Sequence, residues 1–97
     1  MDLIIAVCRA LANSARLCLL RDIHRKPGKT VQALARDLGL SVTATSKHLK
    51  LLRSLHLIQT TPSGRFVRCS PPHNGSTSNA FLCDIQKLIA DLFRMED

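Results

Sequence analysis

Hydrophobic positions recur with helical spacing through the first quarter of the chain, and polar residues divide them into two segments. An apolar residue at every third or fourth position predicts a helix over residues 2–12. Asn13 or Ser14 can cap a second helix, which the sequence KPGK at positions 26–29 ends. The inner face of this second helix is expected to carry Leu17, Leu20 and Ile23.

Two short helices joined by a tight turn are predicted between residues 30 and 55. Thr30 caps the first of them, Gly39 ends it, and Ser41 caps the second, over 42–55. One side of the second helix is small and apolar, with Thr45, Leu49 and Leu52. The other side is hydroxyl-rich and cationic, with Thr43, Ser46, Lys47 and Lys50. A helix that packs with one side and exposes such a surface with the other has the pattern that a DNA recognition helix requires.

A β-hairpin is predicted next, over residues 57–70. Residues 57–60 alternate weakly as a strand, Pro62-Ser63-Gly64 forms the turn, and residues 65–70 return as its partner. Arg65 gives this hairpin a basic tip. The following segment, SPPHNGSTSN at 70–79, has the composition of a linker.

The last predicted helix, over 78–95, carries two apolar stripes. The first stripe consists of Phe81, Ile85, Leu88 and Leu92, and the second of Leu82, Ile89 and Phe93. One stripe is enough to dock an outer helix on a small domain, so the second favours a partner over a wide intramolecular contact. We expect a homodimer in which the first stripe meets Leu3, Val7 and Leu11 of the first helix across a two-fold axis.

The distribution of charge along the chain supports DNA binding more strongly than the overall composition does. The net charge is +7, and no Asp or Glu occurs between Leu38 and Cys83, a span with Lys47, Lys50, Arg53, Arg65 and Arg68. A surface without carboxylates suits the closely spaced phosphates of a DNA duplex. The alternative is a merely solvated basic face.

With 97 residues the chain is expected to form one small domain, 1–97, that dimerisation would help to stabilise.

Cysteine spacing and the N-terminus exclude several other classes. The cysteines at positions 8, 18, 69 and 83 show no C-x-x-C spacing, which argues against a zinc site or a disulfide framework. The apolar run at the N-terminus is too short to span a bilayer, and Asp2 stands where a signal peptide needs positive charge. We therefore expect a cytoplasmic protein with no membrane partner.

Four motifs together resemble the arsenic-repressor (ArsR) family. They are RALANSARL at 9–17, ALARDLGLS at 33–41, SKHLKLLR at 46–53 followed by HLI, and SGRFVRC at 63–69. The resemblance covers roughly residues 8–70 and implies a mainly α fold with a small β-hairpin wing, a winged helix-turn-helix with four helices, two strands and a fifth helix. It also implies a homodimeric transcriptional repressor that binds a two-fold operator in double-stranded DNA and is released by a small inducer, whose identity the motifs do not give.

Three positions depart from the family pattern. Val42 stands where a Gln is common and His56 where a Gly is common, and Arg68-Cys69 replaces an aromatic pair. His56 must adopt a left-handed conformation or let the helix end differently. These differences bear on the operator sequence and leave the expected fold unchanged.

The predicted DNA-binding residues divide by what they would contact. Thr43, Ser46 and Lys47 lie where the recognition helix enters the major groove and are assigned to base edges. Lys50 and Arg53 are assigned to phosphates, together with backbone N–H groups at Thr30 and Ser41. Arg65 is assigned to the minor groove or its phosphates. His48 either makes a structural hydrogen bond or contacts a phosphate.

Other chemistry finds little support in the sequence. Residues 32–38 contain no Cys or His, and Gln86 follows Asp84 where a His ligand would be useful, so no metal or other cofactor is expected. Cys8, Cys18 and Cys83 are packed thiols or, alternatively, a thiol switch that links Cys83 to either of the others. No catalytic grouping indicates an enzyme. A winged-helix protein-interaction module is the remaining alternative, which the exposed Lys47 and Lys50 disfavour.

Overall fold

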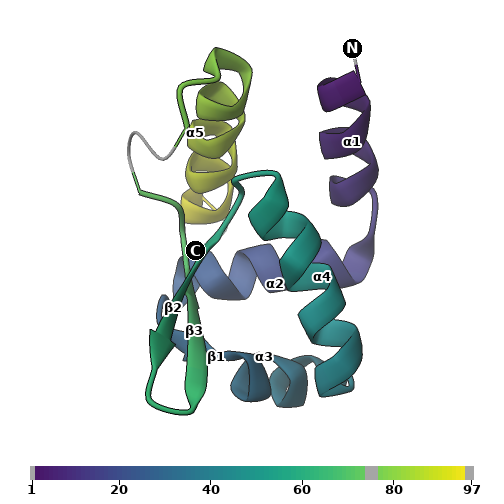
Figure 1. Cartoon of the computed structure of the whole chain (residues 1–97). Coiled ribbons are helices and arrows are strands. Elements are labelled where there is room, and N and C mark those ends of the chain that lie inside the picture. Colours follow the sequence, from purple (N-terminus) through teal and green to yellow (C-terminus); the bar gives the residue numbers. More distant parts are fainter. Residues whose placement is uncertain (1, 74–76, 96–97) are drawn as a thin grey trace.

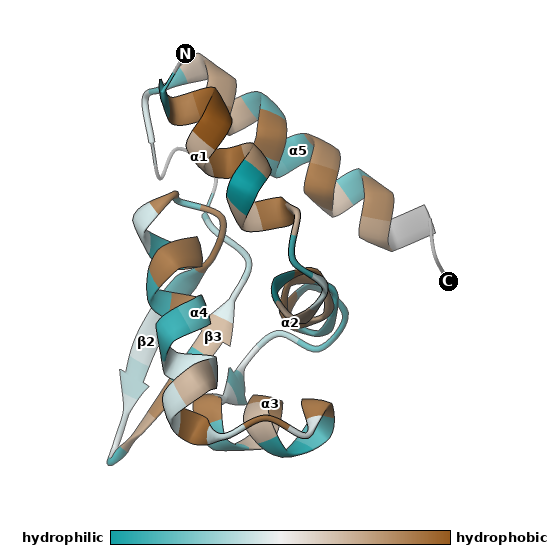
Figure 2. Cartoon of the chain, turned by 90° about the vertical axis from the view of Figure 1, so that its right-hand side faces the viewer, coloured by the Kyte–Doolittle hydropathy of each residue, from teal (hydrophilic) through white to brown (hydrophobic). Residues whose placement is uncertain are grey.

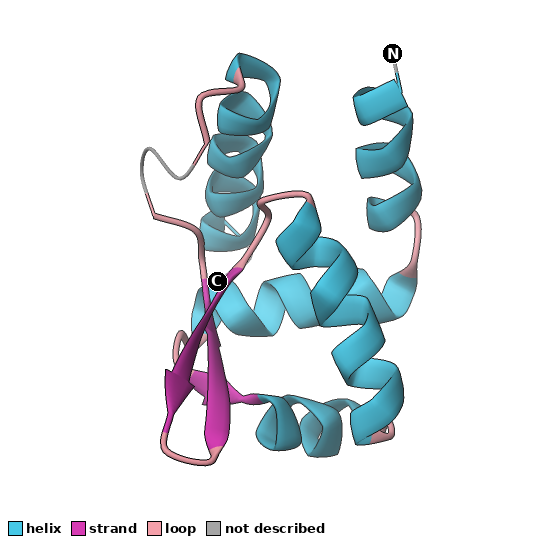
Figure 3. Ribbon diagram, viewed as in Figure 1, coloured by secondary structure: helices cyan, strands magenta, loops and turns pink. Residues whose placement is uncertain are grey.

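The computed structural model describes residues 2–73 and 77–95 and shows five helices with a small three-stranded antiparallel sheet (Figures 1 and 3). The elements are α1 (Asp2–Leu11), α2 (Ser14–Arg25), β1 (Lys29–Thr30), α3 (Val31–Leu38), α4 (Val42–Ser54), β2 (Gln59–Ser63), β3 (Phe66–Ser70) and α5 (Ala80–Met95). Helices α1 and α5 lie at one end of the molecule, and α3 and the hairpin tip lie at the other (Figures 1 and 2). This is the winged helix-turn-helix fold that the sequence predicted.

Side-chain caps set the start of four of the helices. Thr30 Oγ1 accepts a hydrogen bond from Ala33 N at 3.1 Å, and Ser41 Oγ accepts one from Ala44 N at 3.0 Å. These bonds satisfy N–H groups that have no partner within the first turn of a helix. Asn13 caps α2 in the same way, and Asn79 caps α5, which therefore begins at Ala80 and not at Ser78. The predicted caps Thr30 and Ser41 are confirmed.

Helix α4 is followed by a left-handed residue that is not glycine. His56 has φ 59°, which is the first of the two alternatives that the sequence left open. His56 N donates to Arg53 O at 3.0 Å and Leu57 N donates to Leu52 O at 3.0 Å. This pair of bonds is the Schellman arrangement that satisfies carbonyls at a helix end. Gln86 Nε2 of α5 donates to His56 O at 2.5 Å, which ties this end of α4 to the last helix.

The sheet has one strand more than the sequence predicted. Its order is β1-β3-β2, with Lys29 paired to Cys69 and Thr30 to Arg68. A two-residue strand is too short to show the alternation of apolar and polar residues that identifies a strand, so β1 could not be predicted from the sequence. The hairpin itself is shifted, because strand β2 begins at Gln59, after Leu57 and Ile58 have turned into the core.

The hairpin turn is also displaced from its predicted position. Ser63 pairs with Phe66, so the loop consists of Gly64 and Arg65, with Gly64 at φ 63°. Pro62, predicted in the turn, pairs with Val67 inside β2. Proline lacks an N–H and is tolerated there because β2 is an edge strand. Residues 74–76 of the predicted linker lie outside the described residues.

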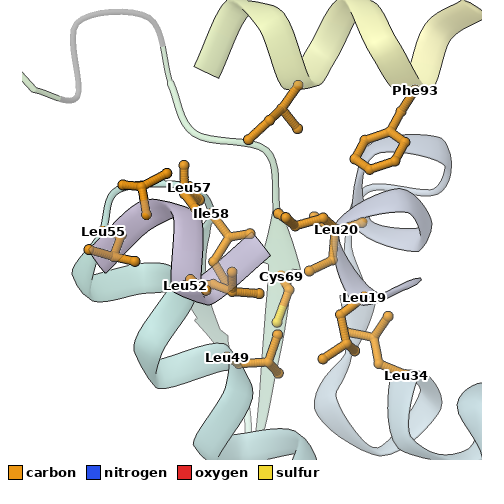
Figure 4. Packing of buried hydrophobic residues seen from close by; sticks show 14 of the residues in the cluster. Leu19, Leu20, Leu34, Leu49, Leu52, Leu55, Leu57, Ile58, Cys69 and Phe93 are labelled. Atoms are coloured by element: carbon orange, nitrogen blue, oxygen red, sulfur yellow. The ribbon is translucent and has the colours of Figure 1, made fainter. Parts of the chain in front are cut away.

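Helix α2 lies at the centre of the hydrophobic core. Its Leu19, Leu20 and Ile23 are fully buried, and they are packed in one cluster with side chains from α1, α3, α4, β3 and α5 (Figure 4). Leu17, expected on the inner face, is exposed, and Leu19 takes that place. Successive helical residues are rotated by about 100°, and Leu17 falls to one side of the buried stripe.

The longest helix among the described residues is α5, with 16 residues. None of the helices in that part of the chain is by itself long and apolar enough to cross a bilayer, although α1 and α2, bent by 85°, pass the length and composition test as a pair.

Candidate nucleic-acid interface

The two sides of α4 differ as the sequence predicted. Leu49 and Leu52 are buried, and so is Thr45, whose hydroxyl donates to Ser41 O at 2.9 Å. On the other side Thr43, Lys47 and Lys50 are exposed and Ser46 is half-buried. The helix therefore presents one hydroxyl-rich, cationic surface to the outside while its opposite side is fixed in the core.

Thr30 and Ser41 use their side-chain oxygens for capping. These oxygens accept from Ala33 N and Ala44 N, so they are not free to accept from another donor in the same direction. The N-termini of α3 and α4 still carry the positive end of the helix dipole. An anion at these two positions could accept hydrogen bonds from free backbone N–H groups of the helix N-termini and from the hydroxyl O–H groups, which capping leaves free to donate.

Two arginines next to the wing are held by the protein. Arg53 Nη1 donates to Thr60 Oγ1 at 3.3 Å, which joins the last turn of α4 to β2. Arg68 Nη1 donates to Gly28 O at 2.8 Å, and its Nε donates to Ser63 Oγ at 3.3 Å. Arg68 thus braces the wing against the segment before β1. Arg65 stays exposed at the wing tip beside Gly64.

His48 makes the structural hydrogen bond that was one of its two predicted roles. Its Nδ1 lies 3.2 Å from Arg16 Nη1. Arg16 also donates from Nε to Ala10 O at 2.7 Å and from Nη2 to Arg9 O at 3.3 Å. Sequence reasoning missed Arg16, since no spacing rule relates residues so far apart in the chain.

The acidic residue just before the basic span is paired. Asp37 accepts a hydrogen bond from Lys29 Nζ, and Asp22 Oδ2 lies 3.9 Å from the same ammonium group. The Lys29 hydrogen bond is the main reason that the pKa of Asp37 lies below its usual value. Lys29 thereby offsets the negative charge closest in sequence to the recognition helix.

Helices α1 and α5 expose large apolar side chains, as do α2, α4 and β3. Leu88 and Leu92 of the first stripe are 63% and 54% exposed, whereas the second stripe, formed by Leu82, Ile89 and Phe93, is buried. The second stripe therefore faces the core, and the first lies beside it, with its Phe81 and Ile85 half-buried against the core and its Leu88 and Leu92 exposed. Figure 2 shows α1 and α5 with largely hydrophobic colouring at the same end of the molecule.

The expected face of α1 needs a correction. Val7 is only 1% exposed and lies in the core of its own protomer, so it has no surface to give a partner. Leu3 and Leu11 are half-buried and pack against that core. Ile4 and Ile5 are the exposed apolar residues of α1. Because α1 is apolar on several sides, its period did not define which side faces inward.

Comparison with known proteins identifies the family. A family model described as a helix-turn-helix domain matches residues 11–60. The chain belongs to the helix-turn-helix family of DNA-binding transcriptional regulators, of the ArsR type. Such regulators are not enzymes. No curated protein sequence matches the chain significantly.

Solved structures of regulators share this fold over nearly the whole chain. One is the homodimeric winged helix-turn-helix DNA-binding domain Mb0332 of Mycobacterium bovis, a possible ArsR-family regulator, at 25% identity and TM-score 0.69, covering 99% of this chain and 85% of that one. NolR of Sinorhizobium fredii is 26% identical at TM-score 0.69, with coverages of 94% and 84%. The regulator HlyU of Vibrio vulnificus is 27% identical at TM-score 0.65, with coverages of 91% and 84%.

The thiols of this ArsR-type regulator differ in environment. Cys8 is exposed, Cys18 and Cys83 are half-buried, and the Cys83 thiol donates to Thr77 O at 3.3 Å. Burial raises the pKa of Cys69 to about 11, so this thiol stays protonated and unreactive at neutral pH. All four cysteines are free, and a switch between Cys83 and Cys8 or Cys18 stays a prediction.

Metal-ligating side chains do not gather in the part of this regulator that the structure describes. Over residues 2–73 and 77–95 there is no group of three or more His, Cys, Asp or Glu side chains that could hold an ion.

Proposed function

We propose that the protein is a homodimeric repressor that binds a two-fold operator in double-stranded DNA through α4 and the wing. The observation that carries the proposal is the exposed side of α4, where Thr43, Lys47 and Lys50 are held outward by the buried Thr45, Leu49 and Leu52. DNA as the partner would place the protein in the cytoplasm.

Base reading is assigned to the first half of α4. Thr43, Ser46 and Lys47 lie near the N-terminus of the helix, the part of a recognition helix that reaches base edges. Lysine donates to the guanine acceptors, and the threonine methyl can contact thymine. Val42, which is also exposed here, offers only an apolar contact.

Phosphate binding is assigned to cations that flank this region. Lys50 and Arg53 follow the base-reading residues on the same helix, and Arg65 stands at the wing tip. Arg53 is already oriented by its bond to Thr60, which reduces the entropy lost when it engages a phosphate. The helix N-termini at Thr30 and Ser41 supply further positive potential. His48, bound to Arg16 through Nδ1, can offer only its Nε2 to a phosphate.

The dimer is assigned to the end of the molecule formed by α1 and α5. Leu88 and Leu92, with the half-buried Phe81 and Ile85, form the α5 side, and Ile4 and Ile5 join Leu3 and Leu11 on α1. Contact with a second protomer would remove these apolar side chains from water. The homodimeric state named for the similar M. bovis domain supports self-association.

Fluorescence anisotropy with the gene's own upstream region tests the proposal. A labelled duplex from that region should bind one dimer far more tightly than a shuffled duplex of the same composition. The logarithm of affinity should fall steeply and linearly with the logarithm of salt concentration, because several phosphates are neutralised per protomer. Footprinting should show two half-sites on one face of the duplex. Equal affinity for both duplexes, or binding that ignores salt, would refute operator recognition.

A further inference from the structure

A pocket of about 170 Å³ opens between α4 and the wing. Its apolar walls come from three separate elements, with Val31 of α3, Leu49 of α4 and Val67 of β3. Its polar groups are two hydroxyls and two cations, contributed by Ser46, Thr60, Lys50 and Arg53. The pocket is thus apolar inside with a positively charged edge.

The charged edge is partly preorganised. Arg53 Nη1 donates to Thr60 Oγ1 at 3.3 Å, so the arginine spans from α4 to β2 beside the pocket. Lys50 lies one helical turn before it on the same face. No carboxylate lines the pocket, and the cations therefore lack an acidic partner there. An occupant with negative charge would meet Arg53, which its bond to Thr60 already orients, and Lys50.

Size and lining together define the class of occupant. A sealed cavity of about 150 Å³ lined by apolar side chains is known to hold one benzene molecule. The present pocket has a similar volume but is open to solvent, so it would enclose only part of such a ring. Inorganic anions gain nothing from Val31, Leu49 and Val67, and a neutral aromatic ring can form no charge-assisted hydrogen bond with Lys50 or Arg53. A ring that carries one carboxylate uses both parts of the pocket.

We propose that this pocket binds a small aromatic carboxylate, which competes with DNA for Lys50 and Arg53. The competition rests on the function proposed above, because it assigns the same two cations to DNA phosphates. A ligand that binds only the DNA-free protein shifts the equilibrium away from the complex as its concentration rises. Such a compound acts as an inducer at the DNA-binding face itself, without a metal or a thiol reaction.

Benzoate is the probe for the binding site. Amide ¹H–¹⁵N spectra of the full chain are followed during titration with benzoate, benzyl alcohol or acetate at constant ionic strength. Benzoate should shift the amides of Ser46, Lys50, Thr60 and Val67 in a saturable way, with a dissociation constant about tenfold or more below that of either comparator, since each lacks one half of the interaction. Equal shifts with acetate would reveal simple ion binding, and unsaturable shifts with benzoate would reveal no site; both overturn the proposal.

Two variants separate the pocket from general charge. Arg53→Gln and Lys50→Gln should each weaken benzoate binding about fivefold or more, because each removes one charge-assisted contact. Arg36→Gln is the matched control, since Arg36 is an arginine of α3 whose side chain is 78% exposed and does not line the pocket. The control should bind benzoate as the parent protein does. A similar loss in all three variants would mean that net charge alone is responsible.

Competition is measured separately. Benzoate added to the complex with a labelled duplex should release the DNA, while acetate at the same ionic strength should not. If benzoate binds but leaves the protein–DNA complex intact, the proposed competition with DNA is refuted, while the proposed benzoate site is retained. If the duplex never binds, the proposed function fails, and the spectra alone decide on the pocket.

Discussion

Arg16 Nη1 lies 3.2 Å from His48 Nδ1 and joins the first turn of α2 to the middle of the recognition helix. A guanidinium group has only donors, so Nδ1 must accept and the neutral imidazole carries its proton on Nε2. The same guanidinium donates to Ala10 O and Arg9 O at the end of α1. One side chain therefore connects a helix of the proposed dimer surface with the helix proposed to read DNA.

Replacing Arg16 by alanine should lower the free energy of unfolding by about 1–3 kcal/mol, because several charge-assisted hydrogen bonds between elements are lost. Urea denaturation followed by circular dichroism measures the change. Arg36→Ala removes an exposed arginine as a control and should change stability by less than about 0.5 kcal/mol. Equal effects of the two substitutions would contradict a structural role for Arg16.

Specificity and affinity should separate within α4. Lys47→Ala is expected to cost about 1–3 kcal/mol on the operator and to relax the preference at one base pair, since it removes a base contact. Arg53→Ala should weaken binding to operator and random duplexes by the same factor and reduce the salt slope. Anisotropy titrations over a set of single-base operator variants distinguish the two patterns. If both substitutions affect all duplexes alike, the assignment of Lys47 to a base is wrong.

Leu88→Glu should convert the dimer into a monomer. The substitution would bury an unpaired carboxylate at the proposed contact between protomers, where no water compensates it. Sedimentation equilibrium gives the molecular mass, and DNA affinity should fall with it. Val42→Glu changes an exposed apolar residue at the opposite end of the molecule and should leave the mass unchanged. A persistent dimer in Leu88→Glu would exclude this surface.

His56→Gly should stabilise the fold. The residue has φ 59°, a conformation that costs a side chain with a Cβ about 1–2 kcal/mol and glycine almost nothing. After the larger entropy of glycine in the unfolded chain is subtracted, the gain should be about 0.5–1 kcal/mol. Urea denaturation measures this gain. His56→Ala retains the Cβ and should show no such gain; if it stabilises equally, the backbone conformation is not the cause.

The Lys29–Asp37 pair should make stability depend on pH in the acid range. The pKa of Asp37 is lowered in the folded protein, chiefly by the Lys29 hydrogen bond, so the contribution is complete above the usual value of 3.8 and is lost as pH falls through the folded value. Parent protein should therefore lose more stability on acidification than Asp37→Asn. Asp84→Asn, at an exposed site of α5, serves as control and should behave like the parent.

Local signals in the sequence predicted the helices and their caps, whereas contacts between distant segments were not predictable. Thr30 and Ser41 are recognisable because a cap acts within its own helix turn. The side of α4 that faces outward followed from its polar residues. In α1 the side expected to meet the partner included the buried Val7, because Ile4 and Val7 are both apolar and only packing distinguishes them. The bond between Arg16 and His48 depends on how three helices pack together, which no local pattern records.

The short strand β1 limits how short a fragment of this chain can be and still bind DNA. Lys29 and Thr30 pair with Cys69 and Arg68, and Arg68 also binds Gly28 O, so the ends of the segment that contains α3 and α4 are fastened to each other. A peptide that stops after α4 keeps the recognition sequence but loses this fastening and the wall that the wing provides. Transferring the DNA specificity of α4 to another regulator therefore requires exchange of the whole segment from Gly28 to Ser70. If the recipient already has its own wing, exchange of the exposed α4 residues alone is enough.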